Sequence, residues 1–288
     1  MASMREIKRR RSSIQSTQQI TKAMKLVSTV KLQRARGRAE NSKPYFRYMY
    51  ETMASLLTKA GTVDHPYLKP NGSERIGIVV ITSNRGLAGG YNANIVRLIQ
   101  ASGFDKENLR LYTAGQKGAD ALARKGYVIA EDVSQVMDTP TYEDARRLSG
   151  RLLSDFTNGE IGTIYLAYTE FKNTVSQIPK LVKLLPMDGQ SCEDGTAAKT
   201  DDLALMTFEP NEEEALGLLI PQYVTSMLYG AFLEAAASEN GARMQAMDSA
   251  TNNAQEMISD LELKYNRARQ GAITQELTEI IAGADAIG

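Results

Sequence analysis

The sequence predicts an α/β domain inserted between two long terminal helices that pair as an antiparallel coiled coil. Both ends of the 288-residue chain are rich in helix-forming residues, and Gly37 is the one glycine between Ser3 and Lys59. The middle alternates short apolar runs with amphipathic stretches, which is typical of β-α-β units. We therefore divide the chain into an N-terminal coiled-coil helix over 1–59, an inserted domain over 60–211 and a C-terminal coiled-coil helix over 212–288.

The N-terminal segment is expected to form one long helix with a small, partly polar seam. Pro44 removes a backbone hydrogen bond and clashes one turn back, so we expect a kink or a short break near Ser42. One set of residues recurs every seven positions, and a second set drifts onto a neighbouring face. The first set is Ile7, Ile14, Thr21, Ser28 and Ala35, and the second is Ile20, Met24, Val27 and Val30.

The inserted segment is predicted to fold as a Rossmann-like α/β domain with a parallel sheet. Thr141 and Asp144 are spaced as a capping box at the start of its third helix. Gln177–Leu185 follows the last parallel strand too closely for a helix, so it should pair antiparallel, and Pro179 suits an edge. The expected strands are 76–82, 109–113, 127–130 and 163–171, the expected helices are 92–101, 116–125 and 141–157, and 188–202 is expected to be a flexible surface loop.

The C-terminal segment is predicted to be helical from Pro221, a residue favoured at helix starts, to residue 286. Apolar and small residues alternate spacings of three and four over four heptads, which is the pattern of a coiled-coil seam. They are Met244, Met247, Thr251, Ala254, Ile258, Leu261, Tyr265, Ala268 and Ala272.

Charge distribution favours pairing of the two terminal helices. The net charge is zero, but residues 1–59 hold 14 Lys and Arg against 3 Asp and Glu, and residues 212–288 hold 4 against 12. A buried Leu or Ile contributes about 1.5 to 3 kcal/mol, whereas an exposed ion pair contributes about 0 to 1 kcal/mol. We therefore expect apolar contacts to hold the pair together and charge to select the partner.

The C-terminal helix is longer than its partner. Counted from the inserted domain, about 57 residues face about 75, so the last 18 or so, roughly 27 Å of helix, have no partner within the chain. From Gln270 onward there is no Lys or Arg, and Ile273, Leu277, Ile280, Ile281 and Ile287 make the end apolar. Such an end is expected to be covered by another protein.

Composition excludes several classes of protein. Cys192 is the one cysteine, so an internal disulfide is excluded, and its polar neighbours indicate a solvated loop thiol. His65 is the one histidine, so a histidine-rich metal site and a Ser/His/Asp triad lack their residues. No stretch approaches the roughly 20 consecutive apolar residues of a membrane span, and the first residues lack the apolar part of a secretory signal. The sequence thus predicts a soluble, non-exported protein.

Three other interpretations were weighed against the coiled coil. Arg85–Asn92 follows a strand and opens a helix as phosphate-binding loops do, but it fits neither G-x-G-x-x-G nor G-x-x-x-x-G-K-[ST]. A tight turn capped by Asn92 is favoured, and a nucleotide-dependent enzyme remains an alternative. The basic residues from Lys8 to Arg38 could bind nucleic acid as a coiled-coil protein, although neutralisation by the acidic helix is favoured. A membrane anchor is disfavoured because the apolar stripe is thin.

No catalytic site emerges from the carboxylates, because Asp201–Asp202 and Glu212–Glu214 are typical of solvated turns and helix starts.

Four motifs resemble the γ subunits of F-type ATP synthases, and the similarity extends over essentially the whole chain. They are Ile20-Thr-Lys-Ala-Met-Lys-Leu-Val27, Ser83-Asn-Arg-Gly-Leu-Ala-Gly-Gly-Tyr-Asn92, Ser249-Ala-Thr-Asn-Asn-Ala254 and Ala268-Arg-Gln-Gly-Ala-Ile-Thr-Gln-Glu-Leu-Thr-Glu-Ile280.

This resemblance implies a non-catalytic rotor of a proton-translocating ATP synthase, without cofactor or metal. The paired helices would stand in a ring of three α and three β subunits, and the α/β domain would contact the ε subunit and the membrane c-ring. Nucleic acid and direct membrane insertion are not expected. The single Cys192 and the lack of a transit peptide favour a bacterial protein on the cytoplasmic face of the membrane, since chloroplast members carry an extra segment with a cysteine pair.

The resemblance also implies two sets of contact residues. Contacts with moving loops of the ring would come from Ile20, Thr21, Lys22, Met24, Lys25, Arg269, Gln270, Thr274, Gln275 and Glu276. Of these, Arg269, Gln270, Thr274 and Glu276 would be the polar contacts. An apolar bearing tip would be formed by Leu277, Ile280, Ile281 and Ile287.

Overall fold

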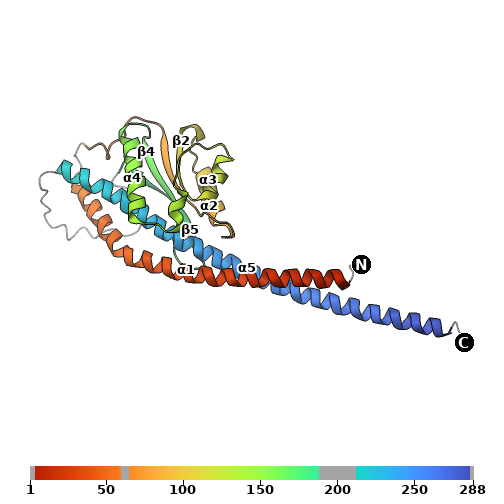
Figure 1. Cartoon of the computed structure of the whole chain (residues 1–288). Helices are drawn as coiled ribbons and strands as arrows, with labels where there is room; N and C mark the ends of the chain where they lie inside the picture. Colours follow the sequence, from red (N-terminus) through yellow and green to blue (C-terminus); the bar gives the residue numbers. More distant parts are fainter. Residues whose placement is uncertain (1–3, 60–64, 188–211, 286–288) are drawn as a thin grey trace. The chain divides into compact units, whose positions relative to one another are not determined.

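The computed structural model describes residues 4–59, 65–187 and 212–285. Two long helices enclose the α/β part in sequence, as Figure 1 shows. The elements are α1 (Met4–Lys59), β1 (Ile76–Ile81), α2 (Tyr91–Ala101), η1 (Lys106–Asn108), β2 (Leu109–Ala114), α3 (Gln116–Ala123), β3 (Ile129–Asp132), η2 (Ser134–Asp138), α4 (Tyr142–Thr157), β4 (Thr163–Phe171), β5 (Gln177–Leu185) and α5 (Glu212–Asp285). The expected loop over 188–202, including Cys192, lies outside the described residues.

The sheet has the strand order β3-β2-β1-β4-β5. Strands β1 to β4 pair in parallel, and β5 pairs antiparallel with β4, with Pro179 on the edge strand opposite Thr169. The predicted parallel sheet and its antiparallel edge are confirmed. The capping box is confirmed too, because the Thr141 hydroxyl accepts from the Asp144 N–H and the Asp144 carboxylate accepts from the Thr141 N–H.

Alternate residues of the strands face two separate cores, which makes the α/β part a three-layer structure. On one face Ile78 and Val80 pack with α2 and α3. On the other face Val79 and Ile81 pack with α4, α5 and the end of α1. Both faces are covered, as the continuous apolar runs of the parallel strands require.

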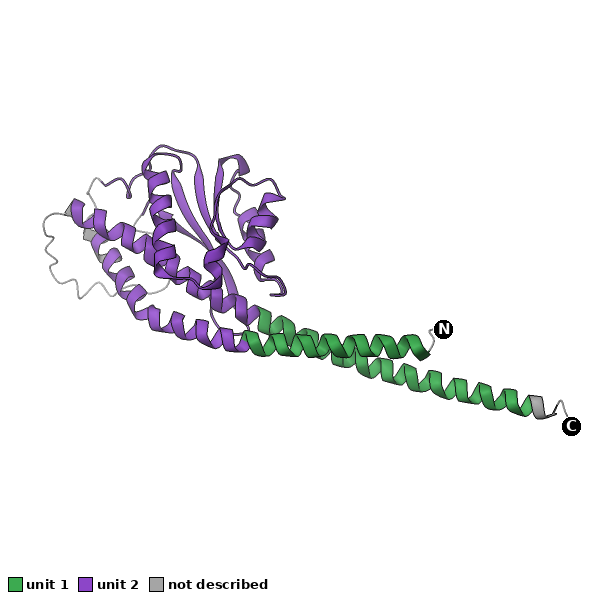
Figure 2. Cartoon of the chain, in the orientation of Figure 1, with its two compact units in different colours: residues 1–28, 243–288 green, residues 29–242 purple. Residues whose placement is uncertain are grey.

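Both terminal helices continue through their prolines, which the sequence predicts to lie at a kink or break and at a helix start. α1 continues through Pro44, so no break occurs near Ser42, and the part of α1 that belongs to unit 2 curves in Figure 2. α5 begins at Glu212 and contains Pro221 in its interior, so Pro221 is not the start. Burial explains how α5 tolerates this residue, because Ile220, Val224 and Leu228 around it are fully buried and packing outweighs the lost backbone bond.

The described chain forms two compact units, coloured separately in Figure 2. Unit 1 contains residues 1–28 and 243–288, and unit 2 contains residues 29–242. Unit 2 therefore includes parts of both long helices together with the sheet. The division into segments 1–59, 60–211 and 212–288 stays a prediction.

Among the described helices, α5 alone is long and apolar enough to cross a bilayer by length and composition. Its apolar first part lies in the core of unit 2, where Leu216, Ile220 and Phe232 are buried against the sheet and its neighbours. A buried core helix passes the same length test, so this feature reflects packing within the protein.

Candidate functional site

Unit 1 is an antiparallel pair formed by the start of α1 and the end of α5. The Thr21 and Thr251 hydroxyls lie 2.8 Å apart, and Lys25 Nζ lies 2.6 Å from Asp248 Oδ1. Farther along, Arg11 pairs with Glu262 at 3.8 Å and lies over the Tyr265 ring. These contacts fix the register, with residue numbers on the two helices changing in opposite directions.

The seam of this pair is small and partly polar, as predicted. Ile7, Thr21 and Ser28 are buried on α1. On α5 the buried seam residues are Met247, Ala254, Ile258 and Leu261. The prediction that Ala272 belongs to the seam is wrong, because Ala272 is exposed. The register places it past Met4, the first described residue of α1, so no described residue lies opposite it.

Beyond Ala268, α5 has no described partner. Every residue from 269 to 282 is exposed, including the apolar Ile273, Leu277, Ile280 and Ile281 at 49%, 55%, 62% and 59% of their surface. Figure 2 shows this part of α5 running past the start of α1 within unit 1. The predicted tip residue Ile287 lies outside the described residues. Apolar side chains exposed over several turns indicate a surface that another protein covers.

The predicted contact residues on α1 have different environments. Ile20 is 60% exposed and Lys22 is exposed, whereas Met24 is half-buried. Thr21 is buried in the seam, and Lys25 is paired with Asp248. Leu26 and Val27, which belong to the same motif, are 61% and 57% exposed and extend the apolar surface beyond the predicted set.

The predicted contact residues on α5 are all exposed and bond mainly along their own helix. The Thr274 hydroxyl donates to the Gln270 carbonyl at 2.9 Å, and Gln275 Nε2 donates to a Glu279 carboxylate oxygen at 2.9 Å. Arg269 and Glu276 are exposed as well. At about 1.5 Å per residue, this group lies roughly 30 Å along α5 from Thr251, the residue opposite Thr21. The two predicted groups therefore lie at different levels of unit 1.

The glycine-rich loop between β1 and α2 uses its polar groups for internal bonds. The prediction that Asn92 caps the following helix is wrong, because Gly90 is the N-cap residue of α2 and no side chain caps the helix. Instead, Asn92 Oδ1 accepts from the Ser83 N–H at 2.9 Å, because Asn92 already lies in the first turn and points back to the end of β1. Asn84 binds the Gln116 N–H and the Ser134 carbonyl. Leu87 has a φ of +62° and is 62% exposed.

No metal-ligand cluster of three or more His, Cys, Asp or Glu residues occurs within the described part of the chain. His65 is buried, and its Nδ1 accepts from the Tyr67 N–H at 3.3 Å. Burial lowers the pKa of His65, and the Glu213 charge opposes this effect. The imidazole is a packed structural group between the 65–68 turn and the start of α5, where it lies 3.5 Å from a Cβ built on Gly217.

Comparison with known proteins identifies the relatives of this chain. The family model described as ATP synthase matches residues 3–287. The ATP synthase gamma chain of Lachnoclostridium phytofermentans is 60% identical over 100% of both chains. The sodium-ion-specific ATP synthase gamma chain of Acetobacterium woodii is 39% identical, over 99% of this chain and 98% of the relative.

Two solved structures share the fold. The central stalk and c-ring structure of the Tetrahymena thermophila mitochondrial ATP synthase contains a chain that is 25% identical, with a TM-score of 0.59 over 80% of this chain and 99% of that one. The rotor of the Euglena gracilis mitochondrial ATP synthase gives a TM-score of 0.69 at 18% identity, over 94% and 98% of the two chains.

Proposed function

Because the chain belongs to the ATP synthase γ-chain family, we propose that it is the central rotor of a bacterial F-type, proton-translocating ATP synthase. It couples ion flow through a membrane c-ring to the conformational cycle of catalytic β subunits, for both ATP synthesis and hydrolysis. The chain itself is non-catalytic, and its part is mechanical. In support, the glycine-rich loop binds its own neighbours.

The observation that carries this proposal is the exposed apolar end of α5. From Ile273 to Ile281 the helix has no described partner, yet its apolar side chains are about half exposed. A ring of α and β subunits would bury this end, and Leu277, Ile280, Ile281 and Ile287 would form the bearing tip. Side chains without ion pairs permit rotation, because no specific partner has to be released at each step.

The proposed contacts with moving loops of the ring lie at two levels. At the level of Thr21, the accessible groups are Ile20, Lys22 and Met24, while Thr21 and Lys25 hold the two helices together. About 30 Å along α5, Arg269, Gln270, Thr274, Gln275 and Glu276 form the second level. We infer that the residues at the level of Thr21 and those from Arg269 to Glu276 contact different loops of the ring.

The proposed partners and location follow from the same role. Unit 2 would contact the ε subunit and the c-ring, and the whole chain would be peripheral, on the cytoplasmic face of the bacterial membrane. Direct membrane insertion is not part of the proposal, because the apolar first part of α5, which includes Leu216, Ile220 and Phe232, is buried in the core of unit 2. Nucleic acid is not a proposed partner either, since Arg11 and Lys25 on the basic helix pair with acidic residues of α5.

Reconstitution with α and β subunits tests the proposal. A bead attached through biotin at Cys192, the one cysteine of the sequence, should rotate in one direction when ATP is added and stop without it. A complex that hydrolyses ATP while the bead stays fixed would refute the rotor role.

The two alternative functions have simpler tests with the isolated chain. A nucleotide-dependent enzyme would bind ATP or NAD at millimolar concentration, and a nucleic-acid-binding protein would shift DNA or RNA at low salt. The rotor role predicts neither result.

A further inference from the structure

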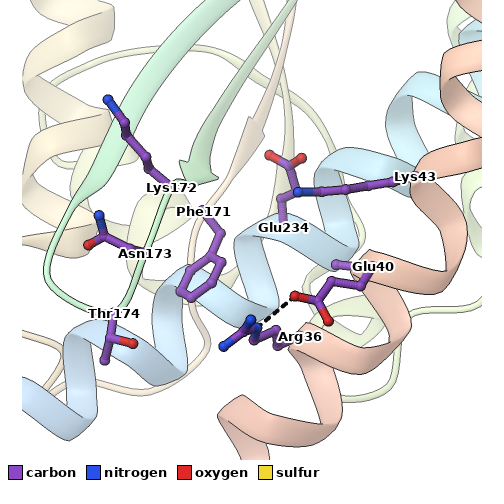
Figure 3. A pocket seen from close by; sticks show the side chains of 9 residues that line it. Arg36, Glu40, Lys43, Phe171, Lys172, Asn173, Thr174 and Glu234 are labelled. Carbon is purple, nitrogen blue, oxygen red and sulfur yellow. Dashed lines mark hydrogen bonds and ion pairs between the residues drawn. The ribbon is translucent and has the colours of Figure 1, made fainter.

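A cavity of about 150 Å³ lies in unit 2, between α1, the β4–β5 turn and α5. Its lining residues are Arg36, Ala39, Glu40, Lys43, Phe171, Lys172, Asn173, Thr174 and Glu234. Figure 3 shows Arg36, Glu40 and Lys43 reaching from α1 toward Phe171, with Glu234 on α5 beside Lys43.

The size of the cavity limits the ligand. Pockets for cofactors and drug-sized ligands occupy about 300 to 1,000 Å³. At about 150 Å³, this cavity has room for a small ion but not for a whole nucleotide.

The charged groups favour an anion. Three cationic residues, Arg36, Lys43 and Lys172, line the cavity against Glu40 and Glu234. Arg36 Nε donates to Glu40 at 2.7 Å, which uses one of the five guanidinium N–H groups and orients the others. When Glu234 is protonated, the lining carries an excess of two positive charges, which matches a doubly charged oxyanion.

Glu234 supplies a buried polar atom that lacks a partner. Its Oε2 is buried and has no hydrogen-bonding partner among the described residues. Burial, followed by the Glu170 charge on β4, raises the pKa of Glu234 to about 7, against the opposing effects of Lys43, the Phe171 N–H and Lys180 on β5. At neutral pH a large fraction of Glu234 therefore carries a hydroxyl, and a buried donor of this kind needs an acceptor.

We propose that this cavity is a binding site for a small oxyanion of the phosphate class, held by Arg36 and Lys43 and by the buried carboxyl group of Glu234. Lys172 adds long-range attraction, since its side chain extends outward in Figure 3. The site is distinct from the rotor contacts in unit 1, and its existence does not depend on the rotor role.

Calorimetric titration of the full-length chain with sodium sulfate and with inorganic phosphate tests the site. Sulfate does not titrate near neutrality, so any pH dependence of its affinity reports on the protein. Because Glu234 titrates at about pH 7, we expect sulfate to bind about tenfold more tightly at pH 6 than at pH 8. The expected dissociation constant is about 1 mM or lower for both anions.

Matched variants distinguish this site from general charge effects. Lys43→Met and Arg36→Gln should each reduce the affinity at least about tenfold, since each removes a direct contact. Glu234→Gln keeps a donor at every pH, so binding should persist while its pH dependence disappears. Lys264→Met and Glu256→Gln, which change exposed residues of α5 in unit 1, should leave the affinity unchanged.

Several results would overturn the proposal. The first is that neither anion binds at about 10 mM, which is about ten times the expected dissociation constant. The second is that the folded Arg36→Gln and Lys43→Met variants both bind sulfate with unchanged affinity. The third is that the affinity of Glu234→Gln still depends on pH. Titration with ADP and ATP shows whether the site binds a free ion or the phosphate groups of a nucleotide. If ADP and ATP bind more weakly than inorganic phosphate, as the cavity size predicts, the site belongs to the free ion. Tighter nucleotide binding that Lys43→Met leaves intact would also contradict the proposal.

Discussion

Gly115 lies directly after β2, with a φ of +127° that residues with side chains rarely adopt. A Cβ at this position would lie 2.2 Å from the Thr82 carbonyl oxygen, which belongs to the neighbouring strand end. The Gly115 N–H also donates a hydrogen bond to the Ser134 hydroxyl oxygen at 3.2 Å. The connection between β2 and α3 is therefore possible only for glycine.

We predict that Gly115→Ala lowers the free energy of unfolding by about 3 kcal/mol, because it combines an unfavourable φ with a backbone clash. Urea unfolding followed by circular dichroism measures this change. Gly150→Ala is the control, since Gly150 lies inside α4 with open space around it and alanine should stabilise by up to about 1 kcal/mol. Equal effects at the two positions would contradict this account.

Glu234 should make the stability of the chain depend on pH. Burial raises its pKa from 4.5 to about 7, so between these values the folded protein keeps a proton that the unfolded chain has lost. The free energy of unfolding therefore falls as the pH rises through this window, and the loss is complete above pH 7.

We predict that Glu234→Gln removes this dependence. In buffer without phosphate or sulfate, the variant should gain up to about 3 kcal/mol relative to the parent between pH 5 and pH 8. Urea unfolding at both pH values measures the gain, and Glu256→Gln, an exposed α5 residue, is the control. A difference between variant and parent that is the same at both pH values would show that Glu234 titrates normally in the folded protein.

At the scale of elements, unit 1 depends on few buried side chains. Leu261 is 9% exposed in the seam, whereas Leu263, two residues on, is 61% exposed. We predict that Leu261→Ala destabilises the helix pair by about 2 kcal/mol, at the lower end for buried leucines, because the seam is narrow.

The same substitution at Leu263 is the control and should change stability by less than about 0.5 kcal/mol. Hydrogen exchange of the unit 1 amides measures the effect locally, without requiring unit 1 to unfold with unit 2. Similar loss of protection in both variants would mean that helix propensity, rather than the seam, stabilises unit 1.

Elements with a local signal could be predicted from the sequence. The apolar runs of β1 and β4 and the capping box at Thr141 depend on neighbours in the chain, and the structure confirms them. Pro44 and Pro221 gave false boundary signals, because both helices continue through them, and at Pro221 the buried neighbours Ile220 and Val224 hold α5 in place. Asn92 is not the N-cap because α2 starts at Tyr91 with Gly90 as its N-cap, which places Asn92 inside the first turn.

The cavity around Glu234 could not be predicted from the sequence. Its residues come from α1, the β4–β5 turn and α5, which are far apart along the chain. An isolated glutamate in a helical stretch also gives no sign that it will be buried. The proposed rotor contacts stay a prediction from contiguous motifs, and their separation along unit 1 follows only from the register of the two helices.

At the scale of the whole molecule, we expect the exposed end of α5 to matter for assembly with other subunits and not for the stability of unit 2. Residues 271–282 are exposed and lie past the start of α1, and their described hydrogen bonds stay within α5. We predict that deletion of 271–288 leaves the unfolding of unit 2 unchanged within about 0.5 kcal/mol but weakens assembly with α and β subunits or uncouples ATP hydrolysis from ion transport. Urea unfolding and ATP-driven proton uptake by reconstituted vesicles measure the two effects.

A second variant distinguishes apolar contact from helix length. Replacing Leu277, Ile280 and Ile281 by Gln keeps the length of α5 and removes its apolar surface, at 55%, 62% and 59% exposure in the free chain. If a socket formed by other subunits buries the exposed part of these side chains, each replacement by Gln removes roughly half of the 1.5 to 3 kcal/mol that full burial contributes. The variant should then behave like the deletion. Normal coupling in the Gln variant would show that the end acts by its length alone, and loss of the unit 2 transition after the deletion would show that the end supports the fold.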